Sequence, residues 1–243
     1  MRIKLTVEYD GTSFCGWQVQ PNGRSVQGEI ETAVYKLTGK TVRVTGSGRT
    51  DSGVHAVGQV AHFDTESAIP PEKFALALNT FLPSDVSVLS SSLACEDFHA
   101  RYSAKKKTYV YSFYVSDVVR PTLERFATRV DGFDIKKAKE MADVIVGEHD
   151  FKCFCKADTD VLTTVRTVYS IDFYKNGDRI DMEITGNGFL YNMVRMIAGA
   201  IKAYLDGKIT VSDLARGFST GEKINFVATM PAKGLTLKSV VYE

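Results

Sequence analysis

The apolar residues of this chain change between a period of two and a helical period, and this order occurs twice. Residues 3–9 alternate apolar and polar side chains, as a half-buried strand does, and Ser25 then precedes a helical pattern that stops at Gly39. Residues 108–115 alternate again, and Asp134 begins a second helical pattern that stops at Gly147. The repeated order predicts two α+β halves of similar layout.

The other patterns extend both halves. No Pro-, Gly- or Ser-rich linker separates them near residues 100–106, which favours one continuous, largely antiparallel sheet flanked by helices over two tethered domains. We assign residues 1–104 to the N-terminal half and residues 105–243 to the C-terminal half. Further strands are expected near residues 42–44, 57–63, 86–93, 163–174, 179–186 and 235–242, with a helix starting at Pro70-Pro71, the longest helix at 189–205 and a short helix after Ser212.

Composition excludes several classes of protein. Apolar residues make up 44% and charged residues 24% of the chain, which is typical of a globular protein and not of a disordered chain, a collagen or a coiled coil. No apolar run reaches the ~18 residues that a membrane span needs, so we expect no membrane association. The four cysteines show no disulfide framework, which is typical of reduced thiols and indicates a cytoplasmic protein.

Charge is distributed unevenly, although 30 basic and 29 acidic residues leave a net charge of only +1. Residues 32–50 contain four cations and no acid, and residues 98–116 contain Arg101 and Lys105–Lys107 among six aromatic residues. Exposed charges act over only about 10 Å at physiological salt, so local stretches matter more to a polyanion than the total does. The two stretches predict contacts with an RNA backbone.

The segment Gly46–Ala56 carries the strongest chemical signal. Its three glycines allow a backbone that approaches a ligand closely, and Arg49 lies two residues before the carboxylate of Asp51. A phosphate-binding P-loop needs a Gly-Lys-Ser/Thr ending, which is absent. Asp51 can also be an ordinary turn residue. Nearby cations, however, keep a carboxylate ionised, which a nucleophile requires.

A metal site is a weaker alternative. His149, Cys153 and Cys155 lie close together in the sequence, but Cys-x-Cys is not the usual spacing of zinc ligands and no second pair follows. We therefore expect no metal. His55 has two readings, a contact to RNA or a buried histidine hydrogen-bonded to backbone.

The sequence resembles the tRNA pseudouridine synthase A family over nearly its whole length. The segment Gly46–Ala56 matches the signature of that family. Four further motifs are present, and all five stand in the order that they have in the family. The four further motifs are Tyr9–Thr12 with Gly16–Gln18, Asp97–Ala104 with Lys107–Tyr111, Gly147–Phe151 and Gly188–Arg195.

The resemblance implies an isomerase that converts uridine to pseudouridine at positions 38, 39 and 40, in the anticodon stem-loop of tRNA. It implies a homodimer, no cofactor and an active-site cleft between the two halves. The matching nucleophile is Asp51, and Arg195 in the long-helix motif pairs with it. Tyr109 matches the residue that stacks on the target base, and Arg49 the one that holds the flipped-out nucleotide.

Two other functions stay open from the residues themselves. A non-catalytic protein that binds an RNA stem-loop would use the same basic segments and aromatic residues and need Asp51 only for structure. An enzyme acting on a small nucleotide would use the glycine-rich loop without RNA, but the missing Lys-Ser/Thr argues against it.

Overall fold

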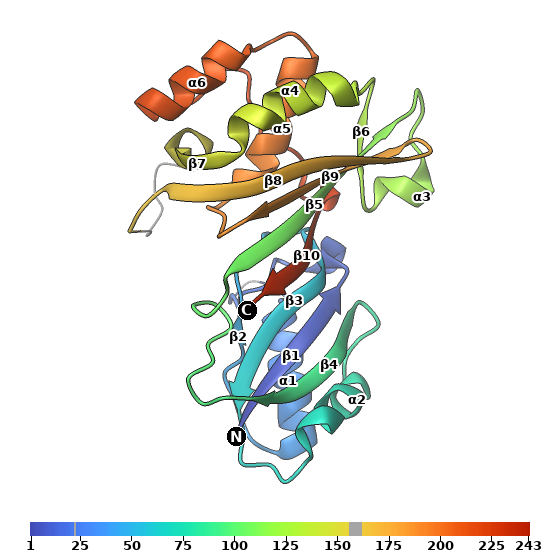
Figure 1. Ribbon diagram of the computed structural model, residues 1–243. Helices are drawn as coiled ribbons and strands as arrows, with labels where there is room; N and C mark the ends of the chain where they lie inside the picture. Colours follow the sequence, from blue (N-terminus) through green and yellow to red (C-terminus); the bar gives the residue numbers. More distant parts are fainter. Residues whose placement is uncertain (22, 156–161) are drawn as a thin grey trace. The chain divides into compact units, whose positions relative to one another are not determined.

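The chain is divided into two compact units, which are drawn in Figure 1. The computed structural model describes residues 1–21, 23–155 and 162–243. The first unit contains residues 1–105 and 236–243, and the second contains residues 106–235. Our sequence-based halves had placed residues 236–243 with the C-terminal half. Strand pairing places them elsewhere, because Thr236 pairs with His55 of the first unit.

The first unit is a sheet with helices on one face (Figure 1). Its strands follow the order β4-β1-β3-β10, with β2 paired to β3. The pairs β1–β3, β1–β4 and β2–β3 are antiparallel, and β10 runs parallel to β3. The elements are β1 (Arg2–Tyr9), α1 (Val26–Thr38), β2 (Thr45–Gly46), β3 (His55–Asp64), α2 (Phe74–Asn79), β4 (Val86–Ala94) and β10 (Leu235–Val241), with short 3₁₀ helices at Gly11–Ser13 and Pro71–Lys73.

Local signals set the ends of α1 as the sequence predicts. The Ser25 hydroxyl accepts a hydrogen bond from the Gly28 N–H, which satisfies one of the free amides at the helix start. Gly39 ends the helix with φ of 69°, a left-handed conformation that glycine adopts without strain. On the sheet, Ile3, Leu5 and Val7 of β1 are fully buried, so the predicted alternation of this strand is confirmed.

The strand expected to run from residues 42–44 into Gly46 exists but begins later than predicted. Only Thr45–Gly46 form β2, and the backbone of Val44 bonds to side chains of α1 instead. The Val44 N–H donates to Glu31 Oε1 at 3.0 Å, and the Val44 carbonyl accepts from Gln27 Nε2 at 3.0 Å. These polar groups are therefore satisfied without a strand partner.

The second unit is also a sheet, with α4, α5 and α6 on one face and the short α3 beside β6 (Figure 1). Its antiparallel strands follow the order β5-β9-β8-β7, and β6 pairs in parallel with β5. A two-residue turn at residues 177–178 joins β8 to β9. The elements are β5 (Lys106–Val115), α3 (Pro121–Glu124), β6 (Thr128–Val130), α4 (Ile135–Ile145), β7 (Gly147–Asp150), β8 (Val165–Asn176), β9 (Arg179–Gly186), α5 (Met193–Leu205) and α6 (Val211–Thr220), with 3₁₀ helices at Phe151–Phe154 and Ala232–Gly234.

Two helix predictions in the second unit need correction. The helix expected at 189–205 begins only at Met193, because Asn192 has φ of 62° and a left-handed residue cannot continue an α-helix. It has 13 residues, as many as α1, so it is not longer than every other helix of the described chain. The last helix is capped by Thr210 rather than Ser212, and Thr210 and Asp213 form a capping box.

These units confirm the predicted fold class, α+β with largely antiparallel strands flanked by helices. In the described ranges, every helix is too short or too polar to cross a lipid bilayer.

Candidate active site

Asp51 lies in the loop between β2 and β3 of the first unit, and its residue is half-buried. The backbone around it is fixed from two sides. The Thr50 carbonyl accepts a hydrogen bond from the Trp17 N–H at 3.1 Å, and the Asp51 carbonyl accepts one from the Val54 N–H at 3.1 Å. Ser52 Oγ donates to the Phe14 carbonyl at 3.1 Å. These hydrogen bonds join the loop to the segment before α1 and thereby fix the backbone that carries Asp51.

Buried polar side chains of β1 and β3 form hydrogen bonds to the same loop. The Tyr9 hydroxyl is hydrogen-bonded to Thr50 Oγ1 at 2.8 Å. Ser47 Oγ donates to Gln59 Oε1 at 2.6 Å, and Gln59 Nε2 donates to the Gly48 carbonyl at 3.1 Å. Burial raises the pKa of Tyr9 to about 12, so its hydroxyl stays protonated at neutral pH. Residues on both sides of Arg49 are therefore anchored to β1 and β3.

Two close contacts leave no room for larger residues beside the loop. A Cβ added to Gly46 would lie 2.5 Å from Cε2 of Trp17, whose side chain is buried. A Cβ on Gly16 would lie 2.5 Å from the Thr50 carbonyl oxygen. Trp17 therefore packs directly against the start of the Asp51 loop.

His55 is buried just beyond the loop. Its Nδ1 accepts a hydrogen bond from the Gly11 N–H at 3.0 Å, and Asp10 Oδ1 lies 3.2 Å from the same nitrogen. Of the two readings of His55, the structure favours a buried histidine bonded to backbone.

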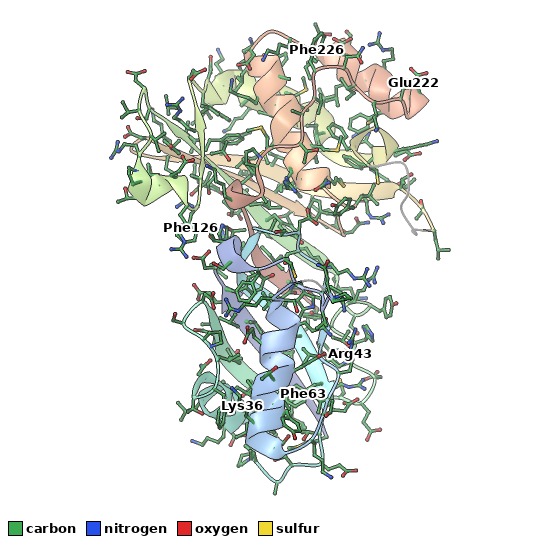
Figure 2. All side chains as sticks on the ribbon, turned by 180° about the vertical axis from the view of Figure 1, so that it is seen from behind. Lys36, Arg43, Phe63, Phe126, Glu222 and Phe226 are labelled. Atoms are coloured by element: carbon green, nitrogen blue, oxygen red, sulfur yellow. The ribbon has the colours of Figure 1, made fainter. Side chains whose placement is uncertain are left out.

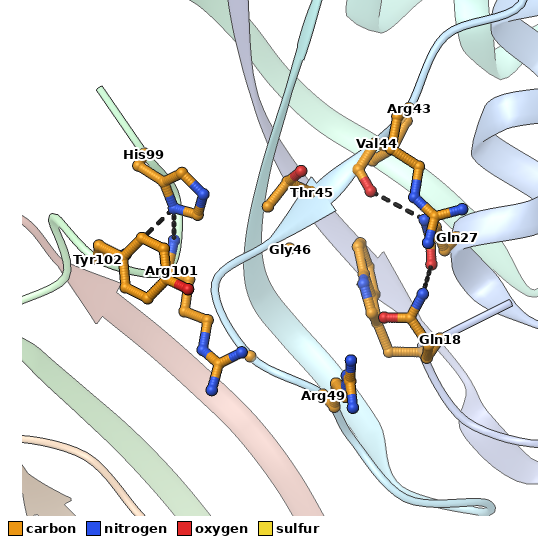
Figure 3. Close-up of a pocket in the computed structure, with 12 residues that line it drawn as sticks. Gln18, Gln27, Arg43, Val44, Thr45, Gly46, Arg49, His99, Arg101 and Tyr102 are labelled. Atoms are coloured by element: carbon orange, nitrogen blue, oxygen red, sulfur yellow. Dashed lines mark hydrogen bonds between the residues drawn. The ribbon is translucent and has the colours of Figure 1, made fainter. Parts of the chain in front are cut away.

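Arg49 is exposed and lines a pocket of about 190 Å³ in the first unit, shown in Figure 3. Arg43 and Arg101 line the same pocket. The pocket therefore brings cations of both basic segments, residues 32–50 and 98–116, to one place. The other lining residues are Trp17, Gln18, Gln27, Val44, Thr45, Gly46, Gly48, His99 and Tyr102.

Tyr109 and Arg195 belong to the second unit. Tyr109 on β5 is 9% exposed, and its ring lies at nearly a right angle to Phe189, with 5.3 Å between the ring centroids. Arg195 lies in the first turn of α5, where Nε donates to the Met230 carbonyl at 2.7 Å and Nη1 donates to Asn192 Oδ1 at 2.9 Å. The pairing of Arg195 with Asp51 stays a prediction.

The residues of the weak metal alternative have other contacts. The His149 ring stacks on Phe218 with 4.3 Å between centroids, and its Nε2 lies 3.3 Å from the Val146 carbonyl oxygen. Burial raises the pKa of the Cys153 thiol to about 12, which disfavours the thiolate that a metal needs. In residues 1–21, 23–155 and 162–243, no three His, Cys, Asp or Glu side chains converge as metal ligands would.

Comparison with known proteins decides the family. The profile of the tRNA pseudouridine synthase family matches residues 5–103 and 141–243, which include Asp51 and Arg195. The chain belongs to the tRNA pseudouridine synthase family. This membership confirms the family resemblance and the prediction of an isomerase that acts on tRNA.

Full-length relatives agree with this assignment. Proteins named tRNA pseudouridine synthase A from Caldicellulosiruptor bescii and Lysinibacillus sphaericus are 45% and 43% identical, each over 99% of this chain and 99% of the relative. A protein of the same name from Listeria innocua is 44% identical over 100% of this chain and 99% of its own length. A chain in the crystal structure of a Cbf5–Nop10–Gar1 complex is 14% identical, with a TM-score of 0.37, over 96% of this chain and 57% of that chain. That similarity is too low to bear on the fold.

Sequence reasoning missed most of the residues that support the loop. Tyr9 and Trp17 stand in the motifs quoted for the resemblance, but their positions beneath the loop depend on pairing between strands distant in sequence. Gln59 carries a usable signal, because it is the one polar side chain in residues 56–61 and such a residue is expected to have a specific partner.

Proposed function

We propose that the protein converts uridine to pseudouridine at positions 38, 39 and 40 of the anticodon stem-loop of tRNA, with Asp51 as the nucleophile. The observation that supports this proposal most directly is the fixed Asp51 loop, which is held by hydrogen bonds to the side chains of Tyr9 and Gln59 and to the Trp17 N–H. A carboxylate held in this way needs little reorganisation when it attacks.

The chemistry of the reaction explains why no cofactor is required. The N1–C1′ bond of uridine breaks and a C5–C1′ bond forms, while C5 loses a proton and N1 gains one. Atoms and electrons therefore balance without an oxidant or a co-reactant. Asp51 can serve by attacking C1′, by adding to the pyrimidine ring or by removing a proton from the sugar, and all three routes keep the carboxylate ionised at the start.

Three residues complete the proposed site. The target base must leave its stack, which costs a few kcal/mol. Stacking on the Tyr109 ring offsets part of this cost, since a base–aromatic stack is worth ~1–3 kcal/mol. Arg49 holds the phosphate of the flipped nucleotide, for which a guanidinium is suited by its forked donors. Arg195 pairs with Asp51 and offsets the cost of burying that carboxylate.

The substrate extends far beyond one stem-loop, and the proposed assembly reflects this. A homodimer related by a two-fold axis gives two active sites and a longer basic track for one tRNA. The proposed location is the cytoplasm, where tRNA is available.

Replacement of Asp51 by asparagine tests the proposal. Asp51→Asn keeps the shape of the side chain and removes its charge, so turnover should be lost while tRNA binding remains. Turnover is measured as tritium released from tRNA that carries [5-³H]uridine, because C5 gives up its hydrogen in the reaction. Asp143→Asn, an exposed carboxylate on α4, is the matched control and should react as the wild type does. Pseudouridine formation by Asp51→Asn would exclude Asp51 as the nucleophile.

Arg195→Met tests the pairing separately. Loss of its charge should leave Asp51 without its proposed partner and reduce turnover strongly. Wild-type turnover by Arg195→Met would contradict the pairing and leave the role of Asp51 standing.

A further inference from the structure

The pocket beside the Asp51 loop has the chemistry of a second nucleotide site. Three of its lining residues are arginines, and none of the lining residues, all in the described part of the chain, carries a carboxylate. Its volume of about 190 Å³ is below the ~300–1,000 Å³ of typical small-molecule pockets. A space of this size and charge suits one unit of a polyanion better than a complete small ligand.

One wall of the pocket is fixed by a single buried amide. Gln27 on α1 is 1% exposed. Its Oε1 accepts hydrogen bonds from Gln18 Nε2 at 2.7 Å and from the Val19 N–H at 3.1 Å. Its Nε2 donates to Glu31 Oε1 at 2.7 Å. The same nitrogen donates to the Val44 carbonyl at 3.0 Å (Figure 3). With all its polar positions used, Gln27 supports the wall and leaves ligand binding to other residues.

The other wall presents an aromatic ring. Tyr102 is 76% exposed, and its ring centroid lies 4.3 Å from that of His99. His99 Nδ1 accepts hydrogen bonds from the Arg101 and Tyr102 N–H groups at 3.1 and 3.3 Å, which fixes the turn that carries both residues (Figure 3). An exposed ring supported by a neighbouring ring is a platform on which a base can stack.

The arginine guanidinium groups have donors available for a phosphate. Within the described residues, the Arg49 and Arg101 guanidinium groups form no hydrogen bond or ion pair with another side chain, and Arg101 lies 5.7 Å from the Tyr102 ring centroid. Arg43 Nε is 3.9 Å from Glu31 Oε1, which is longer than the ~2.7–2.9 Å of a charge-assisted hydrogen bond. Arg43 is therefore oriented by Glu31 without being saturated by it.

We propose that this pocket binds one unpaired nucleotide of the RNA strand next to the target uridine, with its base on Tyr102 and its phosphate between Arg43 and Arg101. The inference rests on the proposed function, because it assigns the neighbour of the nucleotide that Asp51 attacks. Arg49 links the two places, since it lines the pocket and stands two residues before Asp51. A pocket for a free nucleotide would be closed around its ligand. Because Tyr102 and Arg43 are exposed, this pocket is better suited to one nucleotide of an RNA strand that continues beyond it.

A binding cycle between protein and RNA variants tests the proposal. The probes are an anticodon stem-loop hairpin and copies of it in which one loop nucleotide at a time lacks its base. Tyr102→Leu should weaken binding of the intact hairpin at least about fivefold, as loss of a base–aromatic stack predicts, and Tyr102→Phe should bind as the wild type. One of the abasic hairpins should bind the wild type more weakly than the intact hairpin does, by the same factor. Tyr102→Leu should bind that abasic hairpin and the intact hairpin equally. Additive losses at every position would overturn the proposal.

Charge and control variants sharpen the test. Arg43→Gln and Arg101→Gln should weaken binding and reduce its dependence on salt, as loss of a phosphate contact does. The controls are Tyr174→Leu and Lys73→Gln, two exposed residues that lie outside both basic segments and do not line the pocket, and they should bind as the wild type. Arg43, which is labelled in Figure 2, lines the pocket. If Tyr102→Leu weakens uridine monophosphate binding but not hairpin binding, the pocket is a small-molecule site and the proposal is wrong.

Turnover separates this proposal from the proposed function. Tritium release by the wild type from full-length tRNA that carries [5-³H]uridine is measured in parallel. If the wild type forms no pseudouridine, the proposed positions fail, whereas the binding cycle still reports on the pocket. Thermal melting of each variant confirms that a loss of binding is not a loss of folding.

Discussion

The backbone that carries Asp51 is held by buried side chains of β1 and β3. In the proposed reaction the charge of Asp51 supplies the chemistry, while the hydroxyl of Tyr9 and the amide of Gln59 hold the loop on either side of Arg49. Both groups are buried, and a buried polar group that loses its partner costs about 1–3 kcal/mol. Small changes in these residues are therefore expected to affect both folding and turnover.

Replacement of Tyr9 by phenylalanine isolates its hydroxyl. Tyr9→Phe leaves Thr50 Oγ1 without this partner, so we expect the free energy of unfolding to fall by about 1–3 kcal/mol and kcat to fall with it. Urea unfolding and single-turnover rates measure the two effects. Tyr242→Phe is the control, because its half-buried hydroxyl donates to the Ala100 carbonyl at 2.8 Å and makes no bond to the loop. Equal losses of kcat in both variants would contradict a positioning role for Tyr9.

His62 should make the stability of the protein depend on pH. Burial, with smaller contributions from Arg2 and His99, lowers the pKa of His62, and its Nδ1 accepts a hydrogen bond from the Ala100 N–H at 3.2 Å. Below pH ~6.5 the His62 imidazole therefore stays neutral in the folded state but is protonated in the unfolded state. Unfolding consequently takes up a proton in this pH range.

The free energy of unfolding should consequently be retained above that pH and decrease as the pH falls below it. Urea unfolding at about pH 7.5 and about pH 5.5 measures the difference. His62→Gln, which keeps a hydrogen-bond acceptor, should reduce it, and an unchanged difference would assign the pH dependence to other groups.

At the scale of elements, prediction succeeded where the signal lies within one segment. Ser25 and Gly39 stand at the ends of α1 and act on its own backbone, so the helix could be located from the sequence. The start of α5 could not, because residues 189–191 continue the apolar pattern and only the left-handed conformation of Asn192 interrupts it. β7 was missed as well, since Gly147–Asp150 lack an apolar alternation and form a strand through pairing with β8.

The same distinction applies to the candidate site. Asp51 and Arg49 are readable because they share one short motif, whereas the pocket joins residues from Trp17 to Tyr102 that only the folded sheet brings together. The backbone of Val44 is the clearest case that the sequence could not predict, because its hydrogen-bond partners are the side chains of Gln27 and Glu31 on α1.

Gly46 tests the contact between the Asp51 loop and Trp17. In Gly46→Ala, the added Cβ would lie 2.5 Å from the Trp17 ring, so the ring or the loop must move. We expect overpacking to cost about 1–3 kcal/mol of stability and turnover to fall. Gly39→Ala is the control, because φ of 69° makes it costly by about 1–2 kcal/mol while its added Cβ meets only open space. Its kcat should be unchanged, and an equal loss in both variants would exclude a specific effect on the loop.

At the scale of the whole molecule, the proposed homodimer has a direct test. Light scattering at micromolar concentration should give a mass of two chains, and dilution should lower specific activity if one tRNA contacts both subunits. A mass of one chain with full activity would contradict the dimer.

The placement of β10 has a consequence for protein synthesis. Residues 236–243 complete the unit that carries Asp51, and Thr236 and Leu237 pair with β3, the strand that follows the loop. On the ribosome, β3 emerges long before β10, at ~5–20 residues per second, and an unpaired strand edge is prone to wrong pairing. The sheet of the first unit therefore cannot be completed before residues 106–235 have been translated, and a chain released before residue 236 would carry Asp51 on an unfinished sheet.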